Sequence, residues 1–256
     1  NDYKSNTEQE KEQVAYERSY RKYKGIPQPK ISDVKLFLDL YPSKRALHVK
    51  GSYLLVNKTN AETDSVHVIM PGKLKVRKMA LGQPYKEVYK DSVIADYRIL
   101  KLESPLMPGA SVSLDFDMDM VSRGFENGFS GLATPLYNGT FINNQSFLPS
   151  IGYNEQYEIS DNADRKKYDL AYRPTANKIN DTTAWQRNLF IHDADFVTLD
   201  ATVSTERDQI AVAPGYLQKE WEEKGRKFYH YKMDSKILNF YSFLSARYKV
   251  KRDVWK

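Results

Sequence analysis

Residues 111–120 read SVSLDFDMDM, and no other stretch of the chain shows the period of a β-strand so clearly. Serine or aspartate alternates here with an apolar side chain. The apolar positions are Val112, Leu114, Phe116, Met118 and Met120. Because successive side chains of a strand point to opposite faces, this alternation predicts a strand with one face on a core and the other in water.

The same period of two predicts strands on both sides of this stretch. Residues 33–57 are expected to form an antiparallel hairpin that turns near Pro42. Residues 104–109, SPLMPG, are expected to join a strand at 93–103 to the strand at 111–120. Further strands are predicted at residues 66–70, 74–81, 196–204, 210–213, 227–233 and 245–250. Short strands separated by turns are typical of an all-β sandwich.

Helical periodicity is limited to two places. Residues 6–24 are rich in helix formers and carry Tyr16, Tyr20 and Tyr23 in one narrow stripe, and a short helix is expected at residues 161–168. The first helix is interpreted as a linker that packs weakly on the domain or, alternatively, as a stalk from a preceding module. The crossover helices of a parallel α/β fold are missing, so we predict an all-β fold, an antiparallel bent sandwich with a short N-terminal helix and minor helical loops.

The composition excludes several classes of function. The 256 residues contain no cysteine, which removes disulfides, cysteine-ligated zinc and thiol chemistry. The net charge of +6 arises from 39 basic and 33 acidic residues that are mixed along the chain, without the concentrated basic patch of a nucleic-acid-binding protein. No apolar run approaches the roughly 18–20 residues of a membrane span, so we expect a soluble domain. Since the chain starts at Asn1 rather than Met, we expect it to be part of a larger protein.

The sequence predicts no catalytic residue and no metal site. No two of the four histidines lie three or four residues apart, and a His-Glu-x-x-His motif is absent. His192 with Asp193 and Asp195 is interpreted as a turn rather than a metal site. The alternating Asp115, Asp117 and Asp119, about 7 Å apart on one strand face, are interpreted as a solvated face rather than a site for a hard cation.

Several strings, taken in order, resemble one family. They are PKISDV at 29–34 with DLYP at 39–42, VKGSY at 49–53, NKT at 57–59, LESPLMPG at 102–109 before LDFD at 114–117, NGTF at 138–141 and FLPSIGY at 147–153. This order resembles the amino-terminal β domain of M1 zinc aminopeptidases, in particular bacterial membrane proteins in which an ABC-transporter-type permease precedes an M1-like region.

The resemblance implies a saddle-shaped β domain at residues 26–256, preceded by a linker helix at residues 1–25. It implies that this chain binds no metal and catalyses nothing itself. A C-terminal catalytic domain would hold zinc through His-Glu-x-x-His, and neither that motif nor Gly-x-Met-Glu-Asn occurs here. The implied partners are that catalytic domain, the N-terminus of a peptide substrate, and a membrane reached through an upstream transmembrane region. The implied location is a bacterial membrane, with the extracytoplasmic side favoured.

The resemblance also indicates a substrate-binding turn. In the family, a loop with Gln or Glu before an aromatic-Pro segment holds the free amino terminus of the substrate. The matching residues here are Gln145, with Asn143 and Asn144 before it. An amide oxygen can accept a hydrogen bond from an ammonium group, but more weakly than a carboxylate. The alternative is a turn whose amides cap the local backbone.

A second interpretation of the whole chain remains open. The same fold would suit a protein-interaction or scaffold module of a transporter-associated protein, with no catalytic neighbour. That interpretation relies on exposed aromatic side chains, among them Trp185, Trp221 and Trp255. A His-Glu-x-x-His motif downstream in the gene would favour the aminopeptidase, and its absence the scaffold.

Overall fold

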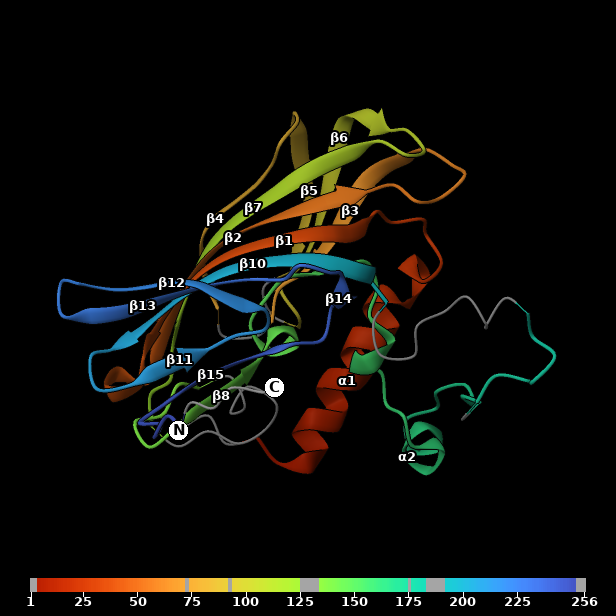
Figure 1. The fold of residues 1–256 in the computed structure, drawn as a ribbon. Helices are drawn as coiled ribbons and strands as arrows, with labels where there is room; N and C mark the ends of the chain where they lie inside the picture. The colour runs from red at the N-terminus through yellow and green to blue at the C-terminus, as the bar shows by residue number, and fades with distance from the viewer. Residues whose placement is uncertain are drawn as a thin grey trace.

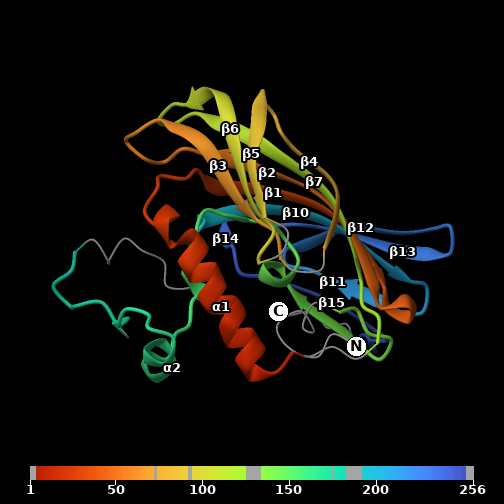
Figure 2. The ribbon, with the colours of Figure 1, turned by 180° about the vertical axis from the view of Figure 1, so that it is seen from behind.

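The computed structural model describes residues 4–71, 74–91, 94–124, 134–174, 176–182 and 192–251. Trp185 and Trp255 lie outside these residues. Figures 1 and 2 show the described chain as a bent assembly of sheets, with the long helix α1 on its lower side. The sheets contain eight, four and three strands, which confirms the predicted all-β sandwich.

The eight-stranded sheet runs in the order β12-β13-β10-β1-β2-β7-β4, and β14 pairs with the start of β10. The predicted hairpin at residues 33–57 is confirmed as β1 and β2, which pair antiparallel. The strand at 111–120 is confirmed as β7, with its five apolar side chains buried. The bounds are β1 (Lys30–Tyr41), β2 (Ala46–Val56), β4 (Lys75–Leu81), β7 (Ser111–Val121), β10 (Ala194–Glu206), β12 (Tyr216–Glu223), β13 (Arg226–Lys232) and β14 (Ile237–Leu238).

The two smaller sheets share one core with the large sheet. Buried side chains from all three, such as Leu38, Val68 and Phe243, belong to one continuous cluster. The four-stranded sheet runs β5-β6-β3-β9 and the three-stranded sheet β11-β15-β8. Their strands are β3 (Thr63–Ile69), β5 (Tyr85–Asp91), β6 (Tyr97–Leu106), β8 (Thr140–Asn143), β9 (Ser150–Ile151), β11 (Ile210–Val212) and β15 (Ser242–Ala246).

Two features of the strand pairing are not indicated by the sequence. β6 and β7 follow one another but lie in different sheets, because β6 pairs with β3 and β5 whereas β7 pairs with β2 and β4. The turn between them is fixed by Asn57, whose backbone N–H donates to Ala110 O and whose carbonyl accepts from Gly109 N. In addition, β1 and β10 pair in parallel, and the described residues between them form strands and short helical segments rather than one crossover helix.

The N-terminal helix packs firmly on the domain, contrary to the weak packing expected for a linker. α1 (Asn6–Tyr20) starts with a capping box formed by Ser5 and Glu8. Tyr16 and Tyr20 are only 2% and 1% exposed, and the Tyr20 ring stacks on Tyr97 with 4.3 Å between centroids. The tyrosine stripe is therefore the contact face of a second hydrophobic cluster. The boundary placed at residue 25 stays a prediction.

The remaining helical segments are short. α2 (Asn162–Lys167) confirms the helix expected near residue 161 and lies beyond α1, away from the sheets, in both ribbon views. The 3-10 turns are η1 (Arg21–Tyr23), η2 (Pro42–Lys44), η4 (Asn144–Ser146) and η5 (Glu155–Tyr157). Among the described residues, no helix combines the length and apolar character that a membrane crossing needs.

Candidate functional site

The predicted substrate-binding residues lie where β8 ends and η4 begins. Asn143 is the last residue of β8, and its side-chain oxygen accepts the backbone N–H of Gln145 at 2.9 Å. The hydroxyl of Ser146 donates to the carbonyl of Asn143 at 2.7 Å. Asn143 therefore caps the turn, while the side chain of Gln145 is exposed.

Asn144 has a different environment, because its side chain is buried. Its Nδ2 donates to Asn239 O at 3.0 Å, and its Oδ1 accepts the backbone N–H of Tyr241 at 3.1 Å. Its backbone N–H donates to Tyr241 O at 2.9 Å. Asn144 thus fastens the turn to residues 239–241, and we assign it to holding Asn143 and Gln145 in place. A substrate-binding role for the three residues stays a prediction.

Asp193 also helps to hold this turn in place through hydrogen bonds. Its buried carboxylate accepts the backbone N–H of Ile151 at 3.1 Å and the amide of Asn239 at 3.5 Å. Asn239 in turn contacts Asn144. A connected set of buried polar groups therefore links the turn to the start of β10, and such groups hold their positions when each one has a partner.

The predicted His/Asp turn does not bring its three side chains to a common site. These residues are His192, Asp193 and Asp195. Asp193 faces Ile151 and Asn239, whereas Asp195 is exposed and pairs with Lys58 at 2.7 Å. His192 lines a hollow of about 240 Å³ that also includes Glu155. Burial lowers the pKa of His192, so its imidazole is held neutral at physiological pH.

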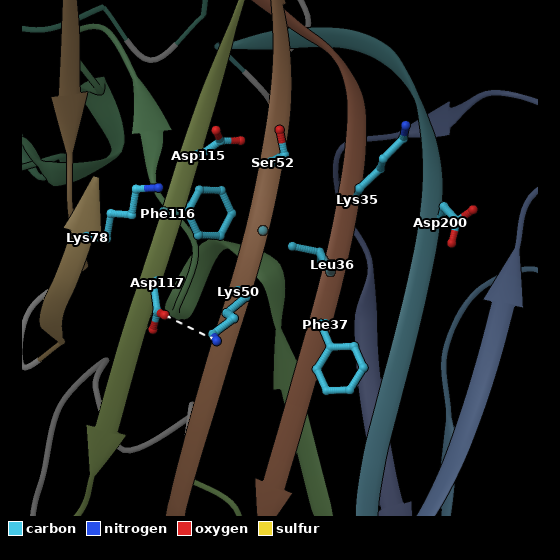
Figure 3. A pocket seen from close by; sticks show the side chains of 11 residues that line it. Lys35, Leu36, Phe37, Lys50, Ser52, Lys78, Asp115, Phe116, Asp117 and Asp200 are labelled. Atoms are coloured by element: carbon cyan, nitrogen blue, oxygen red, sulfur yellow. Dashed lines mark ion pairs between the residues drawn. The ribbon is translucent and has the colours of Figure 1, made fainter. Parts of the chain in front are cut away.

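The exposed face of the eight-stranded sheet contains a second hollow, of about 640 Å³, seen in Figure 3. Asp117 lies 2.9 Å from His48 and 3.6 Å from Lys50, and Asp119 pairs with Arg77. The alternating aspartates of β7 thus lie among basic side chains rather than around a shared point. The described residues include no group of three His, Asp or Glu side chains that could hold a metal ion.

The outer face of the β11-β15-β8 sheet is a feature that the sequence does not predict. Phe141 pairs in register with Leu244, and Leu244 pairs with Val212, so the three side chains form one row across the sheet. Phe141 is 65% exposed and Val212 37% exposed. The next pair on this face is Asn143 with Ser242, so the capping amide is a neighbour of the row.

Exposed apolar side chains continue upstream of β15. Phe196 pairs in register with Leu238 across β10 and β14, and Phe240 follows two residues later with its side chain outward. The exposed fractions of Phe196 and Phe240 are 54% and 55%. We define the apolar face as the row across the three-stranded sheet: Phe141, Leu244 and Val212.

The comparisons with known proteins fall into two parts. No protein-family model matches the chain, and neither does any curated protein sequence. Solved structures, however, do match. An M1 zinc metallopeptidase from Deinococcus radiodurans matches with a TM-score of 0.54 and 12% identity over 85% of this chain. A mutant of that enzyme bound to a Tyr-Ser-Ala substrate matches with a TM-score of 0.53 and 13% identity.

These matches define the fold class of the chain. At such identities they show the fold alone, which is that of the N-terminal domain of M1 metallopeptidases. A further match, described as a two-domain M1 zinc metallopeptidase mutant bound to L-tryptophan, has a TM-score of 0.53 and 12% identity. The chain spans 42% of the length of each of these proteins.

Proposed function

We propose that the chain is the N-terminal β domain of a two-domain, M1-type zinc aminopeptidase and forms one side of its substrate cleft. The observation that carries this proposal is the position of the Asn143–Gln145 turn. In a fold that resembles M1 metallopeptidases over 85% of the chain, this turn stands beside a sheet face that the described residues leave uncovered. A longer protein would place its catalytic domain against that side.

Three histidines of the described chain contact other side chains rather than one another. His48 contacts Asp39 and Asp117, and His230 contacts Asp200 elsewhere on the same sheet. His67 is buried and its Nδ1 lies 2.9 Å from the hydroxyl of Tyr97. In this proposal the second domain would hold the zinc ion, which would supply a polarised water for attack on a peptide carbonyl.

The contribution of this chain would be to hold the amino terminus of the substrate. The side chain of Gln145 is exposed, and Asn143 is fixed by its hydrogen bonds at the end of β8. Amide oxygens at these positions can accept N–H bonds from an ammonium group. A neutral acceptor binds it less strongly than a carboxylate does, so we expect a modest effect on substrate binding.

Association with a bacterial membrane through an upstream ABC-transporter-type permease is a further part of the proposal. Its support is the sequence resemblance alone. Fractionation of cells that express the longer protein tests this part. Recovery of the protein in the soluble fraction would contradict it.

The substrate role is tested with the longer protein and an aminoacyl amide. Gln145→Ala is expected to raise KM roughly five- to tenfold, which corresponds to about 1–1.4 kcal/mol and therefore to the loss of one ordinary hydrogen bond. Gln218→Ala, which removes an exposed glutamine of β12, is the matched control and is expected to leave KM unchanged. Equal KM and kcat in Gln145→Ala and the wild type would remove Gln145 from the site.

A further inference from the structure

The hollow of about 240 Å³ beside His192 lies where three segments meet. It is lined from residues 23–30, which lead from η1 into β1, from residues 151–155, which start in β9, and from the two residues before β10. A pocket for a drug-sized molecule has roughly 300–1,000 Å³. The hollow therefore suits a smaller ligand, of about the size of one amino acid.

Two charged residues of the lining already have ionic partners. The carboxylate of Glu155 lies 2.9 Å from Nζ of Lys24 and 3.9 Å from Nη2 of Arg173. The side chains of Glu155 and Lys24 are 42% and 39% exposed. These charges compensate one another at the protein surface.

The other two charged residues of the lining, Lys30 and Asp193, form no ion pair with any described residue. The backbone N–H of Ile31 donates to Asp193 O at 2.8 Å, so Lys30 and Asp193 stand near each other at the starts of β1 and β10. Asp193 is only 6% exposed, and a buried carboxylate without a cation is costly. Nζ of Lys30 donates to the carbonyl of His192, which leaves two of its three donors.

His192 adds an unpaired acceptor to the same place. Its imidazole is hydrogen-bonded to the backbone of Ile151, and its Nε2 is buried without a hydrogen-bond partner. A neutral imidazole that donates through one ring nitrogen can accept through the other. The lining of the hollow thus combines one unpaired anion and one unpaired acceptor with one unpaired cation.

We propose that this hollow binds a free α-amino acid as its zwitterion. The ammonium group of the ligand would bind to the carboxylate of Asp193 and to Nε2 of His192, and its carboxylate would bind to Lys30. Because Ile26, Tyr23 and Tyr153 also line the hollow, an amino acid with an apolar side chain fits best.

Other classes of ligand fit this lining less well. A phosphate group would meet the negative charge of Asp193 with one unpaired lysine to hold it. A metal ion would lack ligands, since the described residues include no group of three suitable side chains. An organic cation without a carboxylate would leave Lys30 unpaired.

The ligand would also influence the substrate-binding turn, and this part rests on the proposed function. Asp193 contacts Asn239, and Asn239 contacts Asn144 beneath the turn. A ligand held by Asp193 would therefore strengthen the set of buried groups that positions Gln145. Since an aminopeptidase releases free amino acids, the hollow would couple the amount of product to substrate binding.

Calorimetric titration of the 256-residue chain tests the binding site. The probes are L-leucine, 4-methylpentanoate, which lacks the ammonium group, and 3-methylbutylamine, which lacks the carboxylate. We expect a dissociation constant of roughly 0.1–1 mM for leucine and at least about tenfold weaker binding of each truncated probe, because each loses a bond between charged groups. No binding of leucine at about 10 mM, or equal binding of a truncated probe, would overturn the proposal and leave the hollow to water.

Variants and amide resonances locate the site. Lys30→Gln keeps a donor for the carbonyl of His192 but loses the charge, so leucine should bind at least about fivefold more weakly. Lys219→Gln, in the exposed strand β12, is the matched control and should bind leucine like the wild type. Leucine should shift the amide resonances of Gly152 and Asp193. Unchanged affinity in Lys30→Gln, or shifts at neither amide, would contradict the assignment.

The effect on the turn is tested in the longer protein with an aminoacyl amide. Leucine also competes with substrate at the catalytic site, and that competition is common to the wild type and Lys30→Gln. We expect the change in KM caused by leucine to differ at least about twofold between the two proteins. An equal change would overturn the link to the turn. Absence of hydrolysis would contradict the proposed function and leave the calorimetric result for the hollow unaffected.

Discussion

Glu17 and Arg165 form a buried, two-pronged ion pair between α1 and α2. Nη1 of Arg165 lies 2.8 Å from Oε2 of Glu17, and Nη2 lies 2.6 Å from Oε1. Burial alone would raise the pKa of Glu17, but the hydrogen bonds and charge of Arg165, with the charge of Arg21, hold that pKa below its ordinary value. The pair joins a helix near the start of the chain to a segment almost 150 residues later.

Removal of one partner of this pair should destabilise the chain strongly. Arg165→Met removes both Arg165 hydrogen bonds from the buried carboxylate of Glu17, which keeps only its ion pair with Arg21, and we expect a loss of up to about 3–5 kcal/mol in the free energy of unfolding. Lys22→Met, which changes a surface cation next to α1, should change it by less than about 0.5 kcal/mol. Urea denaturation measures both. A loss below about 1 kcal/mol for Arg165→Met would contradict the importance of the pair.

Gly51 should not tolerate a side chain. A Cβ at this position of β2 would lie 2.3 Å from Cζ of Phe116 and 2.7 Å from Cδ2 of Leu36. Gly51→Ala is therefore expected to cost about 1–3 kcal/mol of stability, since overpacking forces side chains from their preferred rotamers. Ser52→Ala, one residue along on the opposite face, is the control. In a Phe116→Leu background the cost of Gly51→Ala should shrink, and an unchanged cost would show that Phe116 is not the obstacle.

His67 should make the stability of the chain depend on pH. Burial lowers the pKa of His67 to about 4 from an ordinary value of 6.5. Between these values the unfolded chain binds a proton that the folded chain does not, so stability rises with pH across this window and is lost on acidification. His67→Asn should flatten the slope of unfolding free energy between pH 4 and 6.5. An equal slope in the variant and the wild type would contradict this prediction.

Asn143 and Asn144 should behave differently although they are neighbours. Asn144→Ala removes the acceptor of Tyr241 N–H and the donor to Asn239 O, and unmade buried hydrogen bonds cost about 1–3 kcal/mol each. Asn143→Ala removes a cap on a short turn, so we expect a loss of about 1 kcal/mol or less. Thermal unfolding of the two variants measures the difference. A larger loss for Asn143→Ala would contradict the assignment of Asn144 as the structural residue.

The sequence predicts a strand where one face of that strand is buried and the other is exposed. β7 is the clearest case, since its five apolar side chains all enter the core. β12 was missed because it lies at the edge of its sheet with nearly every side chain exposed, so its sequence YLQKEWEE carries no period of two. A strand could therefore be predicted when one of its faces is buried, and not when both faces are exposed.

Contacts between distant segments could not be predicted. Nothing in the sequence relates Asn144 to Asn239, or Glu17 to Arg165, because these pairs depend on how the sheets and helices are placed. Phe141 ends the NGTF string of the sequence, and its pairing with Leu244 appears only in the three-stranded sheet. Strands with one buried face were predictable, but the strand order that builds the apolar face was not.

The central claim is that this chain is a β domain whose catalytic partner lies elsewhere in a longer protein. The most direct test compares zinc content and aminoacyl-amide hydrolysis of the 256-residue chain with those of the longer protein. We predict about one zinc ion per molecule and chelator-sensitive hydrolysis for the longer protein, and neither for the chain alone. Hydrolysis or stoichiometric zinc binding by the chain alone would contradict this account, as would a longer protein that has neither.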